Sequence, residues 1–255
     1  MKISIVTIII KKIKEVFENF VFSKLFIKAR KPFNFFKFKA AQFELKENDK
    51  CLLLSPHADD ETFGCGGLLC KYPDNFHVIC MTDGRHGTTD ISPNHTAIIE
   101  KRKKEFENAL SIAGISSYEY LEIEDRELLG NFKTFKTLDI SEYNYIFIPH
   151  FFDNHKDHKA VTFLLQNLLK RNKYKNNLKI IFYEIWSPLP IFNYYTNIDT
   201  FYEKKEKMIQ CYKSQLINLD FAGGILGLNK YRGICVNTSH AEVFYTLTPS
   251  LFLKI

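Results

Sequence analysis

The chain has 255 residues, of which 45% are hydrophobic, and this is enough to bury the core of one domain. Its net charge of +6 is only mildly basic and no nucleic-acid-binding motif accompanies it, so we expect no nucleic-acid partner. None of the six cysteines forms a C-x-x-C pair, and several, such as Cys51 and Cys80, lie in apolar runs. These features are typical of a reduced, cytoplasmic protein and argue against a disulfide framework.

Residues 1–45 differ in composition from the rest of the chain. The stretch 3–10 is apolar, and lysine and arginine alternate with large apolar residues from there to Lys39. The apolar run precedes its positive charges and is too short for a secretory signal or a membrane span. Two interpretations stay open: a helix in peripheral contact with an anionic membrane, at its inner face, or an extra helix packed on the domain. We place the main domain at residues 46–255.

Strand-like and helix-like stretches alternate after residue 46. Strands are predicted from apolar runs bounded by turn residues, and helices from apolar residues that recur every three or four positions. In chain order they are strand 51–55, helix 62–71, strand 76–82, helix 96–113, strands 118–123 and 145–149, helix 158–170 and strand 179–185. This alternation predicts an α/β fold, in which helices cover both faces of a mostly parallel sheet in a Rossmann-like, three-layer arrangement.

The densest group of polar residues directly follows the first predicted strand. It reads Ser55-Pro-His57-Ala-Asp59-Asp60-Glu61. One imidazole and three carboxylates at the end of a buried strand are costly unless a cation or a proton neutralises them, and histidine with aspartate is a typical zinc-binding combination. Because the adjacent Asp59 and Asp60 cannot easily point the same way, one can bind a metal while the other faces a metal-bound water.

A second cluster, His150-Phe-Phe-Asp-Asn-His155-Lys-Asp157-His158, follows the strand at 145–149. Ligands of parallel sheets bind at the carboxyl ends of strands, so the two clusters are expected to meet. His158 opens a predicted helix and is the best candidate for a third ligand, which leaves a coordination position open for water or substrate. His155 is expected to stabilise an oxyanion or to protonate a leaving amine, with Asp157 fixing its protonation state.

Each of these histidines would be an ordinary loop residue if it stood alone. This remains the interpretation of His86, His95 and His150, although all three are candidates to line the site. The two His/Asp clusters at separate strand ends, taken together, favour a metal site.

These motifs resemble the signatures of the LmbE-like, or PIG-L, de-N-acetylase family. The first cluster is similar to the family's Pro-His-Pro-Asp-Asp-Glu, with Ala58 in place of the second proline, so we expect a slightly looser loop with the chemistry intact. The resemblance extends over residues 51–245. Its further motifs are Phe63-Gly-Cys-Gly-Gly67, Thr82-Asp-Gly84, Arg102-x-x-Glu105, His155-x-Asp-His158, Tyr183-Glu-x-Trp186, Tyr212-x-Ser-Gln215 and Ala241-Glu-x-Phe244.

The resemblance implies a role for several of the matching residues. It implies one zinc ion per chain, with ferrous iron as an alternative, held by His57, Asp60 and His158. Asp59 is the implied general base, and His155, oriented by Asp157, the implied electrophile or acid. Arg102 is the implied contact to a polar or phosphorylated part of the substrate, and its alternative is a salt bridge on the helix surface with Glu105 or Glu107.

The activity implied by the resemblance is metal-dependent hydrolysis of the acetamide of an N-acetylated amino sugar. We expect a sugar of the N-acetylglucosamine type, joined to a lipid, a nucleotide or another aglycone, in glycan or surface-polysaccharide assembly. Two alternatives stay open. One is a metal-dependent hydrolase of an ester or phosphoester, the latter commonly with two metals, and the other is a non-catalytic sugar-binding protein. The oligomeric state does not follow from the sequence.

Overall fold

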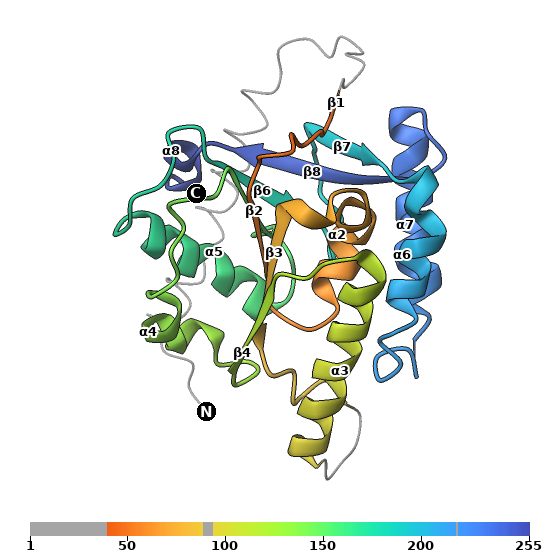
Figure 1. Cartoon of the computed structure of the whole chain (residues 1–255), viewed down its shortest axis with the longest axis horizontal. Coiled ribbons are helices and arrows are strands. Elements are labelled where there is room, and N and C mark those ends of the chain that lie inside the picture. Colours follow the sequence, from red (N-terminus) through yellow and green to blue (C-terminus); the bar gives the residue numbers. More distant parts are fainter. Residues whose placement is uncertain (1–39, 89–93, 218) are drawn as a thin grey trace, which may run out of the picture. The chain divides into compact units, whose positions relative to one another are not determined.

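The computed structural model describes residues 40–88, 94–217 and 219–255 (Figure 1). Ala40–Ile255 form one compact unit. The segment interpreted as a membrane-binding or packed helix thus lies outside the described residues, except for positions 40–45. Those positions belong to the compact unit, because Ala41–Gln42 pair with the sheet and Phe43 is buried in the core. No described helix is long and apolar enough to cross a bilayer.

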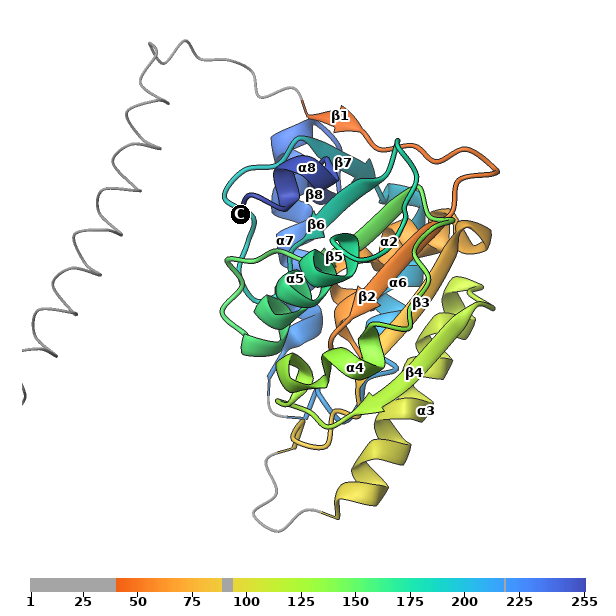
Figure 2. The same cartoon turned by 90° about the vertical axis from the view of Figure 1, so that its left-hand side faces the viewer.

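Among the described residues, one eight-stranded sheet has the order β1-β7-β8-β6-β5-β2-β3-β4 (Figures 1 and 2). The strands are β1 (Ala41–Gln42), β2 (Cys51–Ser55), β3 (Phe76–Thr82), β4 (Tyr118–Ile123), β5 (Tyr145–Pro149), β6 (Lys179–Tyr183), β7 (Tyr194–Asn197) and β8 (Ala241–Leu247). Strands β2 to β6 confirm the five predicted strands, except that β6 ends two residues earlier. The prediction did not include β1, β7 or β8, and β8 runs antiparallel to both β6 and β7.

Helices cover both faces of this sheet (Figure 2). On one face lie α2 (Asp60–Lys71), α3 (His95–Ala113), α6 (Tyr202–Ile209) and α7 (Phe221–Val236). On the other lie α4 (Phe132–Phe135), α5 (Lys156–Leu169) and α8 (Pro249–Phe252). Each layer buries its own hydrophobic cluster against the sheet, which confirms the three-layer α/β fold. Three short 3-10 turns complete the described elements: Pro73–Asn75, Leu128–Asn131 and Asp199–Phe201.

The central strand β2 is covered by helices on both faces, and it is apolar from Cys51 to Leu54. Its side chains alternate between the two faces, so that Leu53 joins one hydrophobic cluster while Leu52 and Leu54 join the other. Helix α3 ends at Ala113, as predicted. The next residue, Gly114, has a φ of 92°, in the left-handed region that glycine adopts without strain.

Glycines let helix α2 approach its neighbours closely. A Cβ atom on Gly64 would lie only 2.3 Å from the ring of Tyr183, and one on Gly67 would lie 2.4 Å from Ile198. Helix α2 begins at Asp60, two residues before the predicted start at residue 62. This packing holds the start of α2, and the polar loop before it, against the carboxyl end of the sheet.

We expect Gly64→Ala to destabilise the protein by about 1–3 kcal/mol, because the added methyl group has no space beside Tyr183. Gly227→Ala in α7 is the matched control, since a Cβ there meets nothing within 4 Å. Alanine is the better helix former, so the control should gain up to about 1 kcal/mol. Urea unfolding measures both variants, and equal effects at the two positions would contradict the close packing of α2.

The strand order places a topological switch between β2 and β5. From β2 the chain continues to β3 and β4 on one side, and then returns to add β5 and β6 on the other. Strands β2 and β5 are parallel neighbours, with Cys51 opposite Tyr145, so their carboxyl ends lie at the same edge. Open α/β sheets bind their ligands at such a point. The two polar clusters of the sequence follow these two strands.

Candidate metal centre and active site

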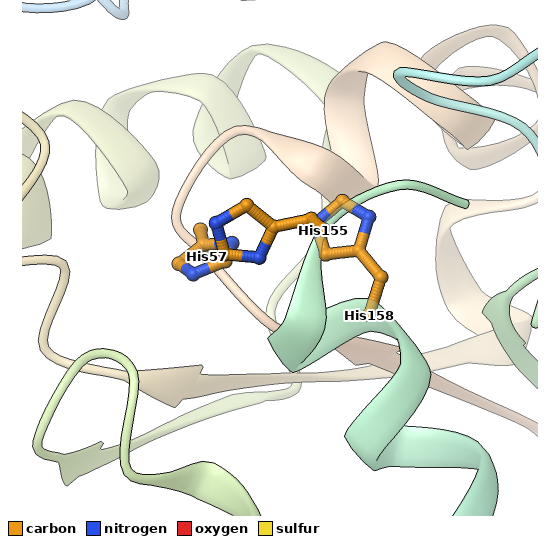
Figure 3. Close-up of side chains that lie close together, drawn as sticks. All are labelled: His57, His155 and His158. Carbon is orange, nitrogen blue, oxygen red and sulfur yellow. The ribbon is translucent and has the colours of Figure 1, made fainter. Parts of the chain in front are cut away.

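Three histidines meet at the switch point (Figure 3). His57 follows β2, His155 caps the start of α5, and His158 lies in the first turn of that helix. The ring centroid of His155 lies 4.6 Å from that of His57 and 4.9 Å from that of His158. Each ring offers a nitrogen to a group of ligand atoms that all lie within 4.8 Å of one another. The structure therefore brings the two sequence clusters together.

Asp60 lies between two of these rings. Its Oδ2 atom is 3.2 Å from Nδ1 of His57 and 3.1 Å from Nε2 of His158. Both Asp60 and His158 are fully buried, and His57 is nearly so. The predicted ligand set of His57, Asp60 and His158 thus converges on one place.

The contacts of these residues fit a bound divalent cation. Within the described part of the chain, Oδ1 of Asp60 and both ring nitrogens of His158 have no hydrogen-bond partner. The ring of His158 lies at ion-pair distance from Asp60 and Asp153, but without hydrogen-bond geometry. Leaving buried polar atoms unpaired is costly, and a cation bound by carboxylate and imidazole would remove that cost.

The local charges also favour a positive ion. Burial alone would lower the pKa of His57 and of His158. The surrounding carboxylates outweigh burial and raise the pKa of His57 well above its usual range and that of His158 to about 9. Burial would raise the pKa of Asp60, but the two imidazoles hold it below its ordinary value. The same negative field that raises these two pKa values would attract a divalent cation.

Asp153, to which the sequence analysis gave no role, fixes the orientation of His158. One of its oxygens lies 3.1 Å from Nδ1 of His158, and the other accepts the backbone N–H groups of Trp186 and Ser187 at 3.0 and 3.2 Å. A carboxylate on the far nitrogen of a ligand histidine sets the direction of the ring. The sequence signal was present, since Asp153 lies inside the second cluster, but its partners follow β6 and are distant in sequence.

Asp157 contacts a different histidine from the one expected. Its carboxylate lies 3.3 Å from Nε2 of His57 and accepts the backbone N–H of Arg126 at 3.1 Å. Only the backbone N–H of Asp157 reaches His155, donating to Nδ1 at 3.3 Å. The neutral ring of His155 therefore carries its proton on Nε2. Burial and the two neighbouring imidazoles lower the pKa of His155, which favours this neutral form.

Asp125 is a further site residue that the sequence analysis missed. It follows β4, and its Oδ1 atom lies 3.3 Å from Nε2 of His57, as does a carboxylate oxygen of Asp157. Its other oxygen accepts the backbone N–H of His86 at 3.2 Å. Burial would raise the pKa of Asp125, but His57 holds it below its usual range. The one sequence feature that could have identified Asp125 is its position just beyond the end of a predicted strand.

Glu61, the third carboxylate of the first cluster, stabilises the loop between β2 and α2 through hydrogen bonds. It is fully buried and accepts the hydroxyl groups of Ser55 at 3.1 Å, Thr62 at 2.6 Å and Tyr212, and the backbone N–H of Asp59 at 3.2 Å. Burial raises its pKa, and the hydrogen bonds from Thr62 and Tyr212 oppose this rise. We infer a structural role for Glu61 at the start of α2.

Asp59 faces a partner that Asp60 does not contact. Its Oδ2 atom lies 3.3 Å from a guanidinium nitrogen of Arg102, a residue of α3. Burial raises the pKa of Asp59 to about 7, with Arg102 opposing the rise. The alternative of a salt bridge on the helix surface does not hold for Arg102, because Arg102 is only 2% exposed and Glu105 binds Ser214.

The other histidines have separate partners. The rings of His86 and His95 lie 5.6 Å apart, and His95 contacts the carbonyl of Arg85. His150 is in the loop after β5, as predicted, but it is 1% exposed and its Nε2 lies 2.5 Å from the carbonyl oxygen of Ser187. We assign none of the three to the metal centre.

Fold and site together define an α/β protein with a buried His/Asp centre at a topological switch point. Residues 52–169 match the family model described as GlcNAc-PI de-N-acetylase, PIG-L. This stretch of the chain therefore belongs to the LmbE-like, or PIG-L, family.

Individual relatives agree with this assignment. The chain is 31% identical over 123 residues to the diacetylchitobiose deacetylase of Thermococcus kodakarensis; the match covers 45% of this chain and 42% of that relative's length. Among solved structures, the inhibitor complex of N,N'-diacetylchitobiose deacetylase from Pyrococcus horikoshii is 25% identical, with a TM-score of 0.66 over 82% of this chain and 89% of that one. The Pseudomonas putida 4-carboxy-2-hydroxymuconate hydratase GalB is 18% identical and shares the fold (TM-score 0.63 over 79% of this chain and 97% of that one).

Proposed function

We propose that this protein is a metal-dependent deacetylase that hydrolyses the acetamide of an N-acetylated amino sugar. The observation that carries the proposal is the division between two adjacent carboxylates. Asp60 faces the ring nitrogens of His57 and His158, whereas Asp59 faces Arg102. One carboxylate is thereby available as a ligand and the other as a base. The deacetylase relatives at 31% and 25% identity support the same activity.

His57, Asp60 and His158 would hold one zinc ion per chain, or one ferrous ion. When bound, such an ion polarises a carbonyl group and lowers the pKa of water towards neutrality. Asp153 and Asp157 contact the far nitrogens of the two ligand histidines and so keep both rings directed at Asp60.

The side chains of the site account for the proton movements of amide hydrolysis. Asp59 accepts a proton as the water oxygen forms its bond to the carbonyl carbon. His155, with its proton on Nε2, donates a hydrogen bond to the oxyanion that develops. The carbon–nitrogen bond then breaks, and Asp59 returns its proton to the departing nitrogen. The products are acetate and a free amino sugar, and no covalent enzyme intermediate is needed.

The family match and the net charge support a finer assignment of the substrate. We propose a sugar of the N-acetylglucosamine type joined to a lipid, a nucleotide or another aglycone, in glycan or surface-polysaccharide assembly. The family description, which refers to a GlcNAc conjugate, and the net charge of +6 both favour an anionic conjugate.

Acetate release is the direct test of the proposal. The zinc-loaded full chain should release acetate from N,N'-diacetylchitobiose or N-acetylglucosamine, and removal of the metal by a chelator should abolish the release. Added zinc or ferrous iron should restore it. Acetate release that persists in metal-free protein, or its absence from a panel of free and conjugated N-acetyl sugars, would contradict the proposal.

The number of metal ions bound per chain distinguishes the proposed one-metal deacetylase from a two-metal phosphoester hydrolase. A second group of potential ligand atoms, from His57, Asp125 and Asp157, lies within 4.8 Å, but it shares His57 with the first. We therefore expect one equivalent of metal per active chain, and two equivalents together with phosphoesterase activity would favour the alternative.

A further inference from the structure

Trp186 is a large aromatic residue that the fold leaves partly uncovered beside the metal centre. It lies in the loop that follows β6, and β6 is the parallel neighbour of β5. The carboxyl ends of the two strands therefore lie at the same edge of the sheet, where ligands of such folds bind. Trp186 is 42% exposed, so a large part of this residue is available to a ligand.

The loop of Trp186 is bound directly to a side chain of the metal centre. Oδ2 of Asp153 accepts the backbone N–H of Trp186 at 3.0 Å, and Oδ1 of the same carboxylate lies 3.1 Å from Nδ1 of His158. One carboxylate thus joins the backbone of Trp186 to a proposed metal ligand. The tryptophan therefore borders the place where the acetamide of the substrate would bind.

Buried polar groups hold this loop in one conformation. Glu184 accepts the backbone N–H of Leu189 at 2.7 Å and pairs with the guanidinium group of Arg232, which also donates to the carbonyl of Leu189 at 2.8 Å. Nε2 of His150 lies 2.5 Å from the carbonyl oxygen of Ser187. The loop is therefore tied at both ends and in the middle, and little of its freedom remains to be lost when a ligand binds.

Two phenylalanine rings fix the orientation of the indole. The ring centroid of Phe63 lies 6.3 Å from that of Trp186 at an interplanar angle of 89°, and that of Phe221 lies 5.0 Å away at 64°. Both contacts are edge-to-face, an arrangement that aromatic rings favour. Phe63 is one turn along α2 from Asp59, whose carbonyl accepts its backbone N–H at 2.9 Å. The indole therefore stands beside the first turns of the helix that follows the proposed base.

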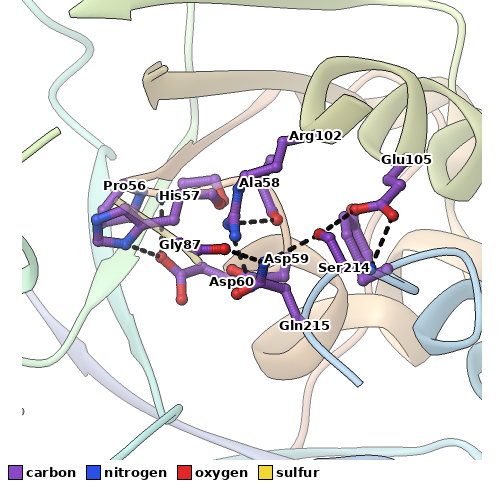
Figure 4. A network of polar contacts seen from close by, with 12 residues as sticks. Pro56, His57, Ala58, Asp59, Asp60, Gly87, Arg102, Glu105, Ser214 and Gln215 are labelled. Atoms are coloured by element: carbon purple, nitrogen blue, oxygen red, sulfur yellow. Dashed lines mark hydrogen bonds and ion pairs between the residues drawn. The ribbon is translucent and has the colours of Figure 1, made fainter. Parts of the chain in front are cut away.

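Polar groups lie on the other side of the metal centre, at the end of β3. There Arg102 lies 3.3 Å from Oδ2 of Asp59, and Gln215 donates to the carbonyl of Gly87 at 3.0 Å (Figure 4). In the sheet, β3 and β6 flank the central pair β2 and β5 on opposite sides. The site thus presents hydrogen-bonding groups on one side and an aromatic surface on the other. A pyranose ring has the matching character, because its hydroxyl groups surround the ring and its C–H groups form apolar faces.

We propose that Trp186 is a carbohydrate-binding residue, whose indole stacks on the C–H face of a sugar ring of the substrate. This inference rests on the proposed function and adds to it the residue that recognises the sugar ring, as distinct from its acetamide. Tryptophan suits the role because it offers a large, rigid contact surface at low cost in conformational entropy. A rigid surface also favours a sugar ring over a flexible acyl chain, which loses more freedom on binding.

Substitution of Trp186 should weaken substrate binding and leave the chemical step intact. We expect Trp186→Ala to raise KM for N,N'-diacetylchitobiose by about 10-fold, which corresponds to about 1.4 kcal/mol. Its kcat and metal content should stay at the wild-type values, because stacking acts alike on the ground state and the transition state. Trp186→Phe keeps an aromatic face and should recover most of the affinity. An unchanged KM in Trp186→Ala, or a Trp186→Phe variant that is equally impaired, would overturn the inference.

Tyr118→Ala is the matched control for these variants. Tyr118 is 39% exposed, and its ring contacts that of Phe106 edge-to-face at 5.9 Å, much as Trp186 contacts Phe63. It begins β4, however, and so lies at the opposite edge of the sheet from the metal centre. Its loss should leave KM and kcat unchanged. An equal rise of KM in Tyr118→Ala would show a general effect of removing exposed aromatic rings and would refute the assignment to Trp186.

Fluorescence tests the contact without turnover. Trp186 is the only tryptophan of the chain, so the tryptophan emission of the full-length protein reports on this residue alone. Glucosamine, a product of the proposed reaction, should change the emission of the zinc-loaded protein in a saturable manner. Acetate, the other product, has no ring and should leave the emission unchanged. Emission that responds equally to both products would contradict stacking on the sugar.

The same measurements separate this inference from the proposed function. If the protein releases acetate from a sugar that leaves the emission unchanged at saturation, the inference alone fails. If glucosamine or N-acetylglucosamine changes the emission but no N-acetyl sugar releases acetate, the deacetylase fails and the sugar contact holds. A protein with neither response would refute both.

Discussion

Asp59→Asn is expected to slow acetate release by about 10²–10⁴-fold, the usual cost of losing a positioned base. This corresponds to roughly 3–5 kcal/mol of barrier. Asparagine keeps the shape of the side chain and can still contact Arg102, but it cannot accept the proton of the attacking water. Asp59 makes its side-chain contact with Arg102, away from the rings of His57 and His158, so the metal should stay bound.

Asp60→Asn provides the comparison for this experiment. Asp60 lies between Nδ1 of His57 and Nε2 of His158, so its loss should weaken metal binding directly. Elemental analysis and kcat are measured for both variants. Metal lost from Asp59→Asn and kept by Asp60→Asn would exchange the two assigned roles, and full activity in both variants would refute the hydrolase itself.

His158→Ala is expected to remove the bound cation together with all measurable acetate release. His158 is fully buried, and its two nitrogens face the carboxylates of Asp60 and Asp153. Without the imidazole, two carboxylates would face a cavity, and too few ligands would remain to hold a catalytic zinc ion. Metal content after gel filtration and acetate release are the measurements, and circular dichroism checks that the fold persists.

Two further variants calibrate this result. His77→Ala is the matched control, because His77 lies near the amino end of β3 and contacts Ser117 and Glu119 instead of the site. It should retain one equivalent of metal and full activity. Asp153→Asn should lie between the two, with metal affinity lowered by about 10–100-fold, as is typical when the partner of a ligand histidine is lost. A full equivalent of metal in folded His158→Ala would remove His158 from the ligand set.

The sequence by itself determined the central part of the fold and which two polar clusters meet at the candidate metal centre. Strands β2, β3 and β5 have the predicted bounds because each is a mostly apolar run, buried on a helix-covered sheet, between turn-forming residues. The edge strand β4 also has the predicted bounds, although only its last residue is buried. That pattern is local and can be read along the chain. The rule that parallel strands end at a common edge then brought His57 and Asp60 near His158, and the structure places these three together.

The tertiary structure alone decided the outer strands and the partner of each polar side chain. Strand β8 lies between β6 and β7 in the sheet, although long stretches of chain separate it from both, and no local periodicity encodes that insertion. Arg102 stands between charged residues in the sequence, as an exposed helix residue would, yet the loop of Gly84 and Gly87 buries it against Asp59. Likewise, Asp157 contacts His57 from another element in preference to its sequence neighbour His155. Periodicity depends on neighbours along the chain, whereas the pairing of one carboxylate with one ring depends on how distant loops pack at the sheet edge.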